Sequence, residues 1–311
     1  MRLWANFSFV SRYALAWIYR CGYSVSRRFR YRPKPFCWKS RLLIIGSFLS
    51  GGAGKTPLVA KMAERWALQN FRVAVLCHRV AWDEFEMLRK KLAGVDVFQT
   101  SNRYELAKKL DGDYDIILCD GGLEDSRFVG ASVFVLRWAE NADSVRGLVP
   151  LGNCVSLEKD HPEAIPIECF RLAESSMETR KAKERLCAFF GISQVKNCFG
   201  ETLPAGAEVC LVTGIGAPER FVRDVESLGV SVKRKVFLPD HSSNYVRYLN
   251  KELRGDYPIV LTEKDAARLE DRTRKNARLY VAKERVEVSE MLDGYLNAAA
   301  GGAAKNPPST L

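Results

Sequence analysis

The stretch that decides the fold is Leu42-Leu-Ile-Ile-Gly46, followed by Ser50-Gly51-Gly52-Ala53-Gly54-Lys55-Thr56. The first part is a short apolar run typical of a buried strand, and the residues after Thr56 have a helical period. Small residues between a strand and a helix let consecutive backbone N–H groups point at phosphate oxygens, and the helix N-terminus adds a partial positive charge. This order of elements predicts a phosphate-binding loop.

Two residues at the end of the loop carry most of the expected chemistry. Lys55 would reach the β and γ phosphates of ATP, and the Thr56 hydroxyl would ligate Mg²⁺. Strict Walker A spacing would place a glycine where the chain has Leu49. The alternative interpretation is a glycine-rich turn without a ligand. The predicted cofactor-binding residues are Ser50, Gly51, Gly52, Ala53, Gly54, Lys55 and Thr56.

Beyond the loop, short apolar runs alternate with charged stretches of helical period, which is typical of an α/β protein. The predicted strands are 42–46, 73–77, 114–120, 132–136, 209–213 and 258–262. The predicted helices are 56–69, 84–92, 104–110, 177–189, 218–228, 244–253 and 266–271. We expect two α/β/α sandwich domains: a P-loop core at 41–199 and a smaller C-terminal α/β domain at 200–297. Residues 298–311 have the composition of a flexible tail.

Charge is distributed unevenly along the 311 residues. The chain holds 48 Lys and Arg against 37 Asp and Glu, a net charge of +11, and residues 1–41 hold ten of these cations and no acid. The remainder is almost neutral, which argues against a nucleic-acid partner, because such binders spread basic residues over a folded face. Nine scattered cysteines without a CxxC pair favour a reducing compartment over a disulfide framework or zinc site.

The N-terminal segment, residues 1–40, combines this charge with apolar side chains. On a helical wheel, apolar residues between positions 3 and 21 share one third of the circumference, and residues 26–35 interleave aromatic residues with cations. Arginines interrupt the apolar residues too often for a spanning helix, and no signal-peptide cleavage site follows. We therefore expect a membrane-associating amphipathic helix that lies on an anionic surface. The alternative is a core-packing helix followed by a solvated basic loop.

Five segments after the loop occur in the order found in one family. They are Asp83-Glu84, Leu148-Val-Pro-Leu-Gly152, Thr213-Gly-Ile-Gly-Ala-Pro-Glu-Arg-Phe221, Phe237-Leu-Pro-Asp-His241 and Thr262-Glu-Lys-Asp-Ala266. Together with the unaltered loop motif at 51–57, they make the chain resemble the tetraacyldisaccharide 4′-kinases, the lipid A 4′-kinase family of Gram-negative bacteria. The resemblance extends from the N-terminal helix to the region of residue 297.

The resemblance implies transfer of the γ-phosphate of ATP to the 4′-hydroxyl of an acylated glucosamine disaccharide 1-phosphate, which yields lipid IV-A. The implied partners are this lipid and the inner-membrane surface, and the implied location is the cytoplasmic face of that membrane, as a peripheral protein. Phosphoryl transfer requires in-line placement of the donor, neutralisation of charge and removal of the acceptor proton.

By resemblance, Asp83 is the base or orienting carboxylate for the acceptor hydroxyl, and His241 is its partner from the second domain. The pair is chemically reasonable, because a carboxylate fixes the imidazole tautomer and an imidazolium offsets carboxylate charge. With Lys55, they are the predicted catalytic residues. The alternatives are an N-cap for a helix that begins at Glu84, in the case of Asp83, and a cap or turn residue in the case of His241.

Asp120 ends the apolar run that begins at residue 114, which is where a Walker B carboxylate sits, so Thr56 and Asp120 are the predicted Mg²⁺ ligands. The family pattern here is Asp-Asp-Gly-x-Gln-His, whereas this chain reads Asp120-Gly-Gly-Leu-Glu-Asp125. One of two adjacent acids is therefore missing. A strand-end carboxylate that caps the following turn is the alternative for Asp120.

A longer family segment, with Arg-Gly-Tyr-Gly and an extended loop, is replaced here by residues 77–82. Either His78 or Arg79 stands for the family arginine, and Arg103 is similar to an arginine expected to contact phosphate. Two other functions stay open. One is a membrane-cycling P-loop ATPase, although Ser50 replaces the signature lysine of that class. The other is a nucleotide-binding membrane scaffold without turnover.

Overall fold

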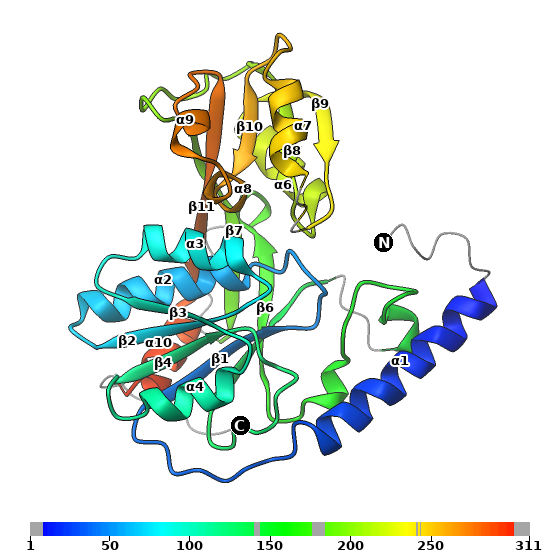
Figure 1. Ribbon diagram of the computed structural model, residues 1–311, viewed down its shortest axis with the longest axis vertical. Helices are drawn as coiled ribbons and strands as arrows, with labels where there is room; N and C mark the ends of the chain where they lie inside the picture. The colour runs from blue at the N-terminus through cyan, green and yellow to red at the C-terminus, as the bar shows by residue number, and fades with distance from the viewer. Residues whose placement is uncertain (1–8, 140–143, 176–183, 241, 243, 302–311) are drawn as a thin grey trace.

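One sheet of eleven strands runs through the molecule in the order β3-β2-β4-β1-β5-β6-β7-β11-β10-β8-β9 (Figure 1). The structure, a computed structural model, describes residues 9–139, 144–175, 184–240, 242 and 244–301. Each pairing within the sheet is parallel except that of β7 with β11. The strands are β1 (Arg41–Ser47), β2 (Val73–His78), β3 (Asp96–Thr100), β4 (Ile116–Asp120), β5 (Ser132–Arg137), β6 (Ile165–Arg171), β7 (Cys187–Asn197), β8 (Glu208–Thr213), β9 (Ser231–Phe237), β10 (Ile259–Thr262) and β11 (Leu279–Val288).

Two ends of this sheet form an N-terminal half, with strands β1–β6, and a C-terminal half, with strands β8–β10. The long strands β7 and β11 run from one half to the other (Figure 1). The α-helices are α1 (Phe9–Phe29), α2 (Lys55–Leu68), α3 (Trp82–Lys91), α4 (Arg103–Leu110), α6 (Pro218–Glu226), α7 (Tyr245–Glu252), α8 (Glu263–Ala267), α9 (Asp271–Arg274) and α10 (Glu290–Ala299). Short 3₁₀ turns are η2 (Val145–Gly147), η3 (Glu158–Asp160) and η4 (Leu172–Glu174). Each half has apolar clusters of its own on the two faces of the sheet.

The position of β1 explains where the phosphate loop lies. This strand pairs with β4 on one side and β5 on the other, and all its residues after Arg41 are buried. Parallel strands covered on both faces are expected to be continuous apolar runs, as this one is. Ligands of open α/β sheets bind at the carboxyl ends of the strands, at the point where the connections from two neighbouring strands run to opposite sides of the sheet. The loop after β1 occupies that position.

The predicted secondary structure is confirmed for most elements, and one helix is wrong. The six predicted strands coincide with β1, β2, β4, β5, β8 and β10, although β4 begins at Ile116. The helix expected at 177–189 is wrong at its described end: residues 187–189 belong to β7, which pairs with both β6 and β11, and residues 184–186 are neither helix nor strand. Short apolar runs do not distinguish a buried strand from a helix by period alone. The helix expected at 266–271 is instead the end of α8 and the start of α9.

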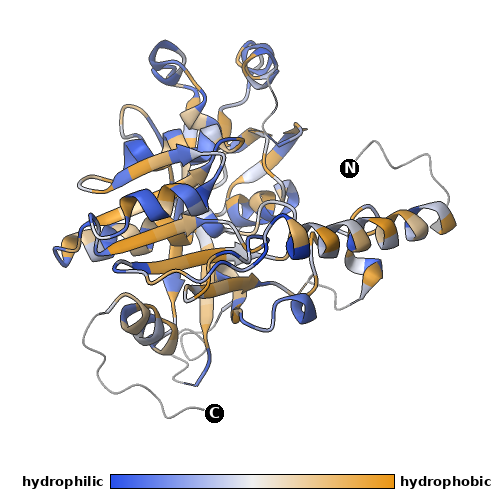
Figure 2. Ribbon diagram, turned by 60° about the horizontal axis from the view of Figure 1, so that its bottom comes forward, coloured by the Kyte–Doolittle hydropathy of each residue, from blue (hydrophilic) through white to orange (hydrophobic). Residues whose placement is uncertain are grey.

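Helix α1 extends away from the sheet along one side of the N-terminal half (Figure 2). Arg12 donates to the Pro150 carbonyl (2.9 Å), and Tyr19 donates to the Val155 carbonyl (2.9 Å). The apolar stripe expected at its surface faces away from these contacts: Val10, Ala14, Trp17, Ile18 and Cys21 are exposed. Among the described residues, no helix combines the length and apolar character needed to cross a membrane.

Part of the segment predicted to be a flexible tail, residues 298–301, is folded and packs on the N-terminal half. Helix α10 continues to Ala299, and Ala300 is buried in the core of the N-terminal half, both inside the segment expected to be a flexible tail. Residues 302–311 lie outside the described part of the chain.

Candidate active site

The glycine-rich loop joins β1 to α2 as expected, and side chains from two distant segments hold its backbone. Gly52 and Gly54 have φ angles of 64° and 88°, which favour glycine. Trp138 Nε1 donates to the Ala53 carbonyl (2.8 Å). Arg220 Nη1 donates to the Gly52 carbonyl (2.7 Å), and its guanidinium lies 3.7 Å from the centroid of the Trp138 ring. Trp138 and Arg220 therefore fix the loop backbone just before Lys55, the first residue of α2.

A loop of the C-terminal half lies directly on the phosphate loop. A Cβ atom added to Gly216 would come within 2.6 Å of the Gly51 carbonyl carbon, and one on Gly52 would come within 2.6 Å of the Ala217 nitrogen. The glycines are therefore required for close approach of two backbones, in addition to any approach of a ligand. The motif at 213–221 that carried part of the resemblance is the segment that makes this contact.

Between the two halves lies a cavity of about 130 Å³ whose lining includes the loop residues 52–56. Apolar residues form one wall: Phe190, Ile192, Ile215, Phe221 and Val286. Charged side chains, among them Glu84, Lys264 and Glu284, form another. Burial, followed by the charge of Glu263, raises the pKa of Glu284 to about 7. A phosphate-binding turn beside an apolar wall is the composition expected of a nucleotide pocket.

Thr56 and Asp120, the predicted metal ligands, are in contact. The Thr56 hydroxyl donates to Asp120 Oδ2 (2.7 Å), and Asp120 Oδ1 is buried with no hydrogen-bond partner among the described residues. Burial, followed by the charge of Glu84, raises the pKa of Asp120 to about 6. No group of three or more His, Cys, Asp or Glu side chains in the described residues is arranged to hold a metal ion. The two residues fit Mg²⁺, which takes one or two protein ligands together with phosphate oxygens and water.

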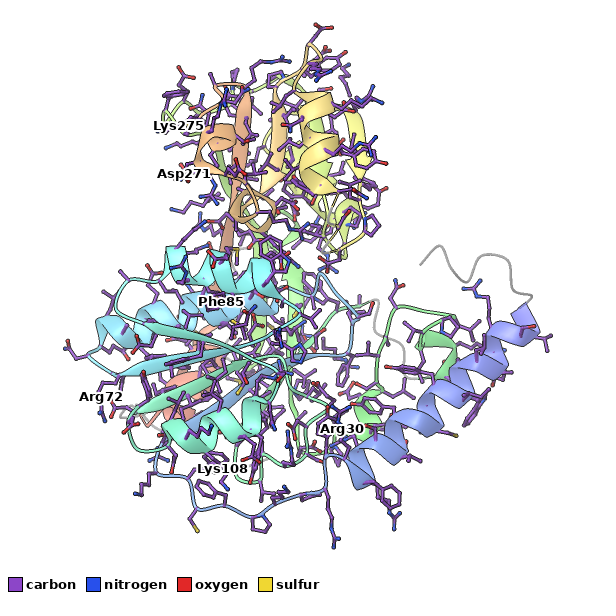
Figure 3. All side chains as sticks on the ribbon, in the orientation of Figure 1. Arg30, Arg72, Phe85, Lys108, Asp271 and Lys275 are labelled. Atoms are coloured by element: carbon purple, nitrogen blue, oxygen red, sulfur yellow. The ribbon has the colours of Figure 1, made fainter. Side chains whose placement is uncertain are left out.

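Asp83 lies in the first turn of α3, whose N-cap is Ala81, so the capping alternative is wrong. Its side chain is fully buried at the junction of the two halves, on the helix where Figure 3 labels Phe85. Arg268 donates to Asp83 Oδ2 through Nε (3.0 Å) and through Nη2. Lys264 Nζ lies 3.8 Å from the same oxygen. A carboxylate of the N-terminal half is thus held by two cations of the C-terminal half.

Lys264 connects Asp83 to the nucleotide cavity. It lines the cavity and donates to Glu84 Oε1 (3.0 Å) and Asp240 Oδ1 (2.9 Å). Burial alone would lower the pKa of its ammonium, but the carboxylates of Glu84, Asp240 and Asp83 raise it instead. The lysine is therefore a charged group at physiological pH, placed between the phosphate loop and Asp83.

The turn after Asp120 is held by Arg103, another residue of the sequence-based expectations. Arg103 Nη1 donates to the Asp120 carbonyl (2.8 Å), and Nη2 donates to Glu124 Oε1 (2.9 Å). A Cβ atom on Gly121 would lie 3.2 Å from Arg103 Nη1, and φ at Gly121 is 78°. Glu124 is therefore the acid that pairs with Arg103 in this chain, while Gly121 contributes no side chain.

The structure brings together Lys55, Thr56 and Asp120, with Asp83 at the same junction through Lys264. Ser50 donates its backbone N–H to the Asn153 carbonyl (2.8 Å). His241 lies outside the described residues. His78 is partly buried, and Arg79, which is exposed, donates its backbone N–H to the Thr100 carbonyl (2.9 Å).

Sequence reasoning missed three side chains that hold this site: Trp138, Arg220 and Arg268. Arg220 lies inside a recognised motif and Arg268 follows another by two residues, so proximity to those motifs was the available signal. Trp138 follows β5 without any motif, and its contact with the loop is visible only in three dimensions.

Strand, glycine-rich turn and helix meet a buried acid of the neighbouring strand, which is the arrangement that P-loop nucleoside-triphosphate-binding proteins share. A family model described as tetraacyldisaccharide-1-P 4′-kinase (LpxK) matches residues 12–300. The chain belongs to this kinase family, whose members act in lipid A biosynthesis.

Relatives and a solved structure agree with this assignment. The chain is 26% identical over 284 residues to the tetraacyldisaccharide 4′-kinase of Dechloromonas aromatica, covering 82% of each protein. It is 25% identical over 299 residues to the enzyme of the same name from Chlamydia caviae, covering 82% of this chain and 79% of that one. The structure is similar to that of "apo" form LpxK from Aquifex aeolicus in complex with ATP, with a TM-score of 0.64, 17% identity, and 92% and 97% of the two chains covered. This last likeness shows the mixed α/β fold with its large, mostly parallel sheet.

Proposed function

We propose that this chain transfers the γ-phosphate of ATP to the 4′-hydroxyl of tetraacyldisaccharide 1-phosphate and so forms lipid IV-A. One observation carries the proposal beyond family membership. Lys264 lines the cavity at the phosphate loop and also contacts Glu84 and Asp83, so the donor site and the carboxylate meant for the acceptor meet at one junction.

The donor side of the reaction rests on the phosphate loop. Backbone N–H groups of residues 51–56 would bind the phosphates, and Lys55 would offset charge on the transferring group. Thr56 and Asp120 would hold Mg²⁺, since the buried Asp120 Oδ1 has no partner among the described residues. A bound Mg²⁺ would neutralise phosphoryl charge and help to orient the donor.

On the acceptor side, Asp83 would orient the 4′-hydroxyl and accept its proton, with His241 as its partner. Asp83 is buried beside Arg268 and Lys264, whose cationic groups hold its carboxylate in place. General-base catalysis of this kind contributes about 10²- to 10⁴-fold.

We also infer that residues 41–199 and 200–297 act as two domains, despite the shared sheet. Separate apolar clusters on the two sides of the β7–β11 pair support this division. The cavity at their junction would then open and close around the nucleotide, as expected of enzymes that exclude water during phosphoryl transfer.

The membrane-facing surface would be the exposed stripe of α1, at the cytoplasmic face of the inner membrane. Replacing Ile18, which is 66% exposed, by Asp should lower the fraction bound to anionic vesicles in sedimentation. Phe199→Asp is the matched control, since Phe199 is 65% exposed on the C-terminal half. Equal loss in the two variants would contradict a role specific to α1.

The decisive experiment is transfer of labelled γ-phosphate from ATP to tetraacyldisaccharide 1-phosphate in detergent. Lipid product that depends on Lys55 and Asp83 supports the kinase. Hydrolysis of ATP on vesicles without lipid product would support the membrane-cycling ATPase instead. Nucleotide binding with neither reaction would leave a scaffold without turnover, which the change to Gly121 in the metal-binding turn motivates.

A further inference from the structure

Arg268 is the buried cation closest to Asp83, and it belongs to the opposite half of the molecule. It follows α8, its side chain is 2% exposed, and both its Nε and Nη2 donate to Asp83 Oδ2. Asp83 itself is fully buried, so this pairing removes the cost of an isolated charge in the interior. Unlike Lys264, Arg268 does not line the nucleotide cavity.

The guanidinium of Arg268 is held from the C-terminal half by other groups. Nη2 donates to the Gly214 carbonyl (3.3 Å), and Nη1 lies 3.7 Å from Asp265 Oδ1. The ring of Tyr245 lies beneath it, with 5.4 Å between its centroid and the guanidinium carbon. A planar cation held by an acid, a carbonyl and a ring has a defined orientation.

Asp265 is fixed in turn by the ends of two strands. Its Oδ2 accepts from the hydroxyls of Thr213 (2.7 Å) and Thr262 (2.8 Å), and its Oδ1 accepts from the Gly214 N–H (3.1 Å). These residues end β8 and β10 or follow directly after. A continuous set of hydrogen bonds and ion pairs therefore runs from the C-terminal sheet through Asp265 and Arg268 to Asp83.

The same segment also touches the phosphate loop. Gly214 precedes Gly216 by two residues, and Gly216 packs against the backbone of Gly51 and Gly52. A displacement of the C-terminal half would therefore alter the cover of the phosphate loop and the environment of Asp83 together. The two effects have one structural cause, the position of residues 213–217.

We propose that Arg268 is a positioning residue for Asp83, which places the carboxylate for the acceptor hydroxyl only when the two halves are closed. The proposal rests on the role of Asp83 in the proposed function. Arg268 touches neither the phosphate loop nor the cavity, so it acts through Asp83. Misplacement of a reacting group by about 1 Å can cost about 100-fold in rate, which sets the effect expected.

The test is a double-mutant cycle between Arg268 and Asp83, measured as transfer of labelled phosphate to the lipid. Arg268→Ala should lower kcat about 100-fold and leave the KM for ATP and lipid within about twofold. Arg268→Lys, which retains the charge, should have a kcat at least about tenfold higher than that of Arg268→Ala. In an Asp83→Ala background, Arg268→Ala should have no further effect, because the group it positions is gone.

The matched control is Arg171→Ala. Arg171 forms another ion pair between the halves, with Asp224 (3.1 Å), and is 12% exposed in its side chain, but it does not contact Asp83. Arg171→Ala should lower the rate of phosphate transfer by the same factor in the wild type and in the Asp83→Ala background. If Arg268→Ala does not fold, Arg268→Gln takes its place in the cycle.

Three results would overturn the proposal: a wild-type kcat in Arg268→Ala, a loss that multiplies in the Asp83→Ala background, or a folded Arg268→Lys no better than Arg268→Ala. Absence of lipid product with the wild-type protein would instead overturn the proposed function. The two failures are therefore separable.

Discussion

Asp120 and Asp83 are both buried acids of the N-terminal half, yet their surroundings differ in charge. Asp120 accepts from Thr56, leaves Oδ1 without a hydrogen-bond partner among the described residues, and has a pKa raised to about 6 by burial and by Glu84. Asp83 contacts Arg268 and Lys264. An acid that forms no ion pair with a described residue suits an external cation, whereas an acid already paired with Arg268 and Lys264 suits a fixed position.

The largest effect is expected from removing Lys55, the cation on the Asp120 side of the comparison. Lys55→Ala should lower phosphate transfer about 1000-fold, because it removes the positive charge that the proposed mechanism places on the transferring group. It also removes a charge that lowers the pKa of Asp120. Lys61→Ala, on the same helix and outside the cavity lining, is the control and should stay within about threefold of the wild-type rate. A Lys55→Ala rate within tenfold of wild type would contradict this role.

The second prediction concerns the contribution of the Asp83–Arg268 ion pair to stability. Asp83→Asn should lower the free energy of unfolding by about 3 to 5 kcal/mol, since it leaves Arg268 buried without its carboxylate. Urea unfolding measures this loss. Asp271→Asn, in α9 of the C-terminal half (Figure 3), changes an acid outside the buried core and should alter stability by less than about 0.5 kcal/mol. Equal stability of Asp83→Asn and the wild type would show that Asp83 is not an ion-pair anchor.

The donor side of this comparison could be predicted from the sequence, because its residues are close in the chain or follow a strand. The loop at 50–56 and the acid at the end of β4 have strong local patterns, and the contact of Thr56 with Asp120 follows from adjacent parallel strands. The acceptor side could not be predicted in the same way. Arg268 and Asp83 are 185 residues apart, and no local period links them.

The shared sheet shows the same limit. Strands β7 and β11 join the two halves, but the sequence predicts a helix at 177–189, which overlaps the start of β7. An apolar run without alternation carries no information about its pairing partner. Family resemblance predicts a role for Asp83, whereas its position in the first turn of α3, after the Ala81 cap, is visible only in the structure.

The third prediction concerns the pH dependence of stability on the Asp120 side. The pKa of Asp120 is about 6 in the folded protein, against 3.8 for an unperturbed aspartate. Between these values the folded state binds more protons than the unfolded state, so the free energy of unfolding falls as pH rises. Asp120→Asn removes this loss. Between pH 4 and pH 7, the free energy of unfolding of Asp120→Asn should rise by about 2 to 3 kcal/mol relative to that of the wild type, as measured by urea unfolding in EDTA.

Only the difference between the two proteins isolates this effect. Burial, followed by the charge of Arg27, lowers the pKa of His161 from 6.5 to about 4 beneath α1. Over the same pH range the folded state then binds fewer protons at His161, and stability rises with pH, which offsets Asp120 in the wild type. Because His161 is present in both proteins, its contribution cancels on subtraction. Parallel stability curves for wild type and Asp120→Asn would mean that Asp120 already has a compensating cation, and the contrast with Asp83 would fail.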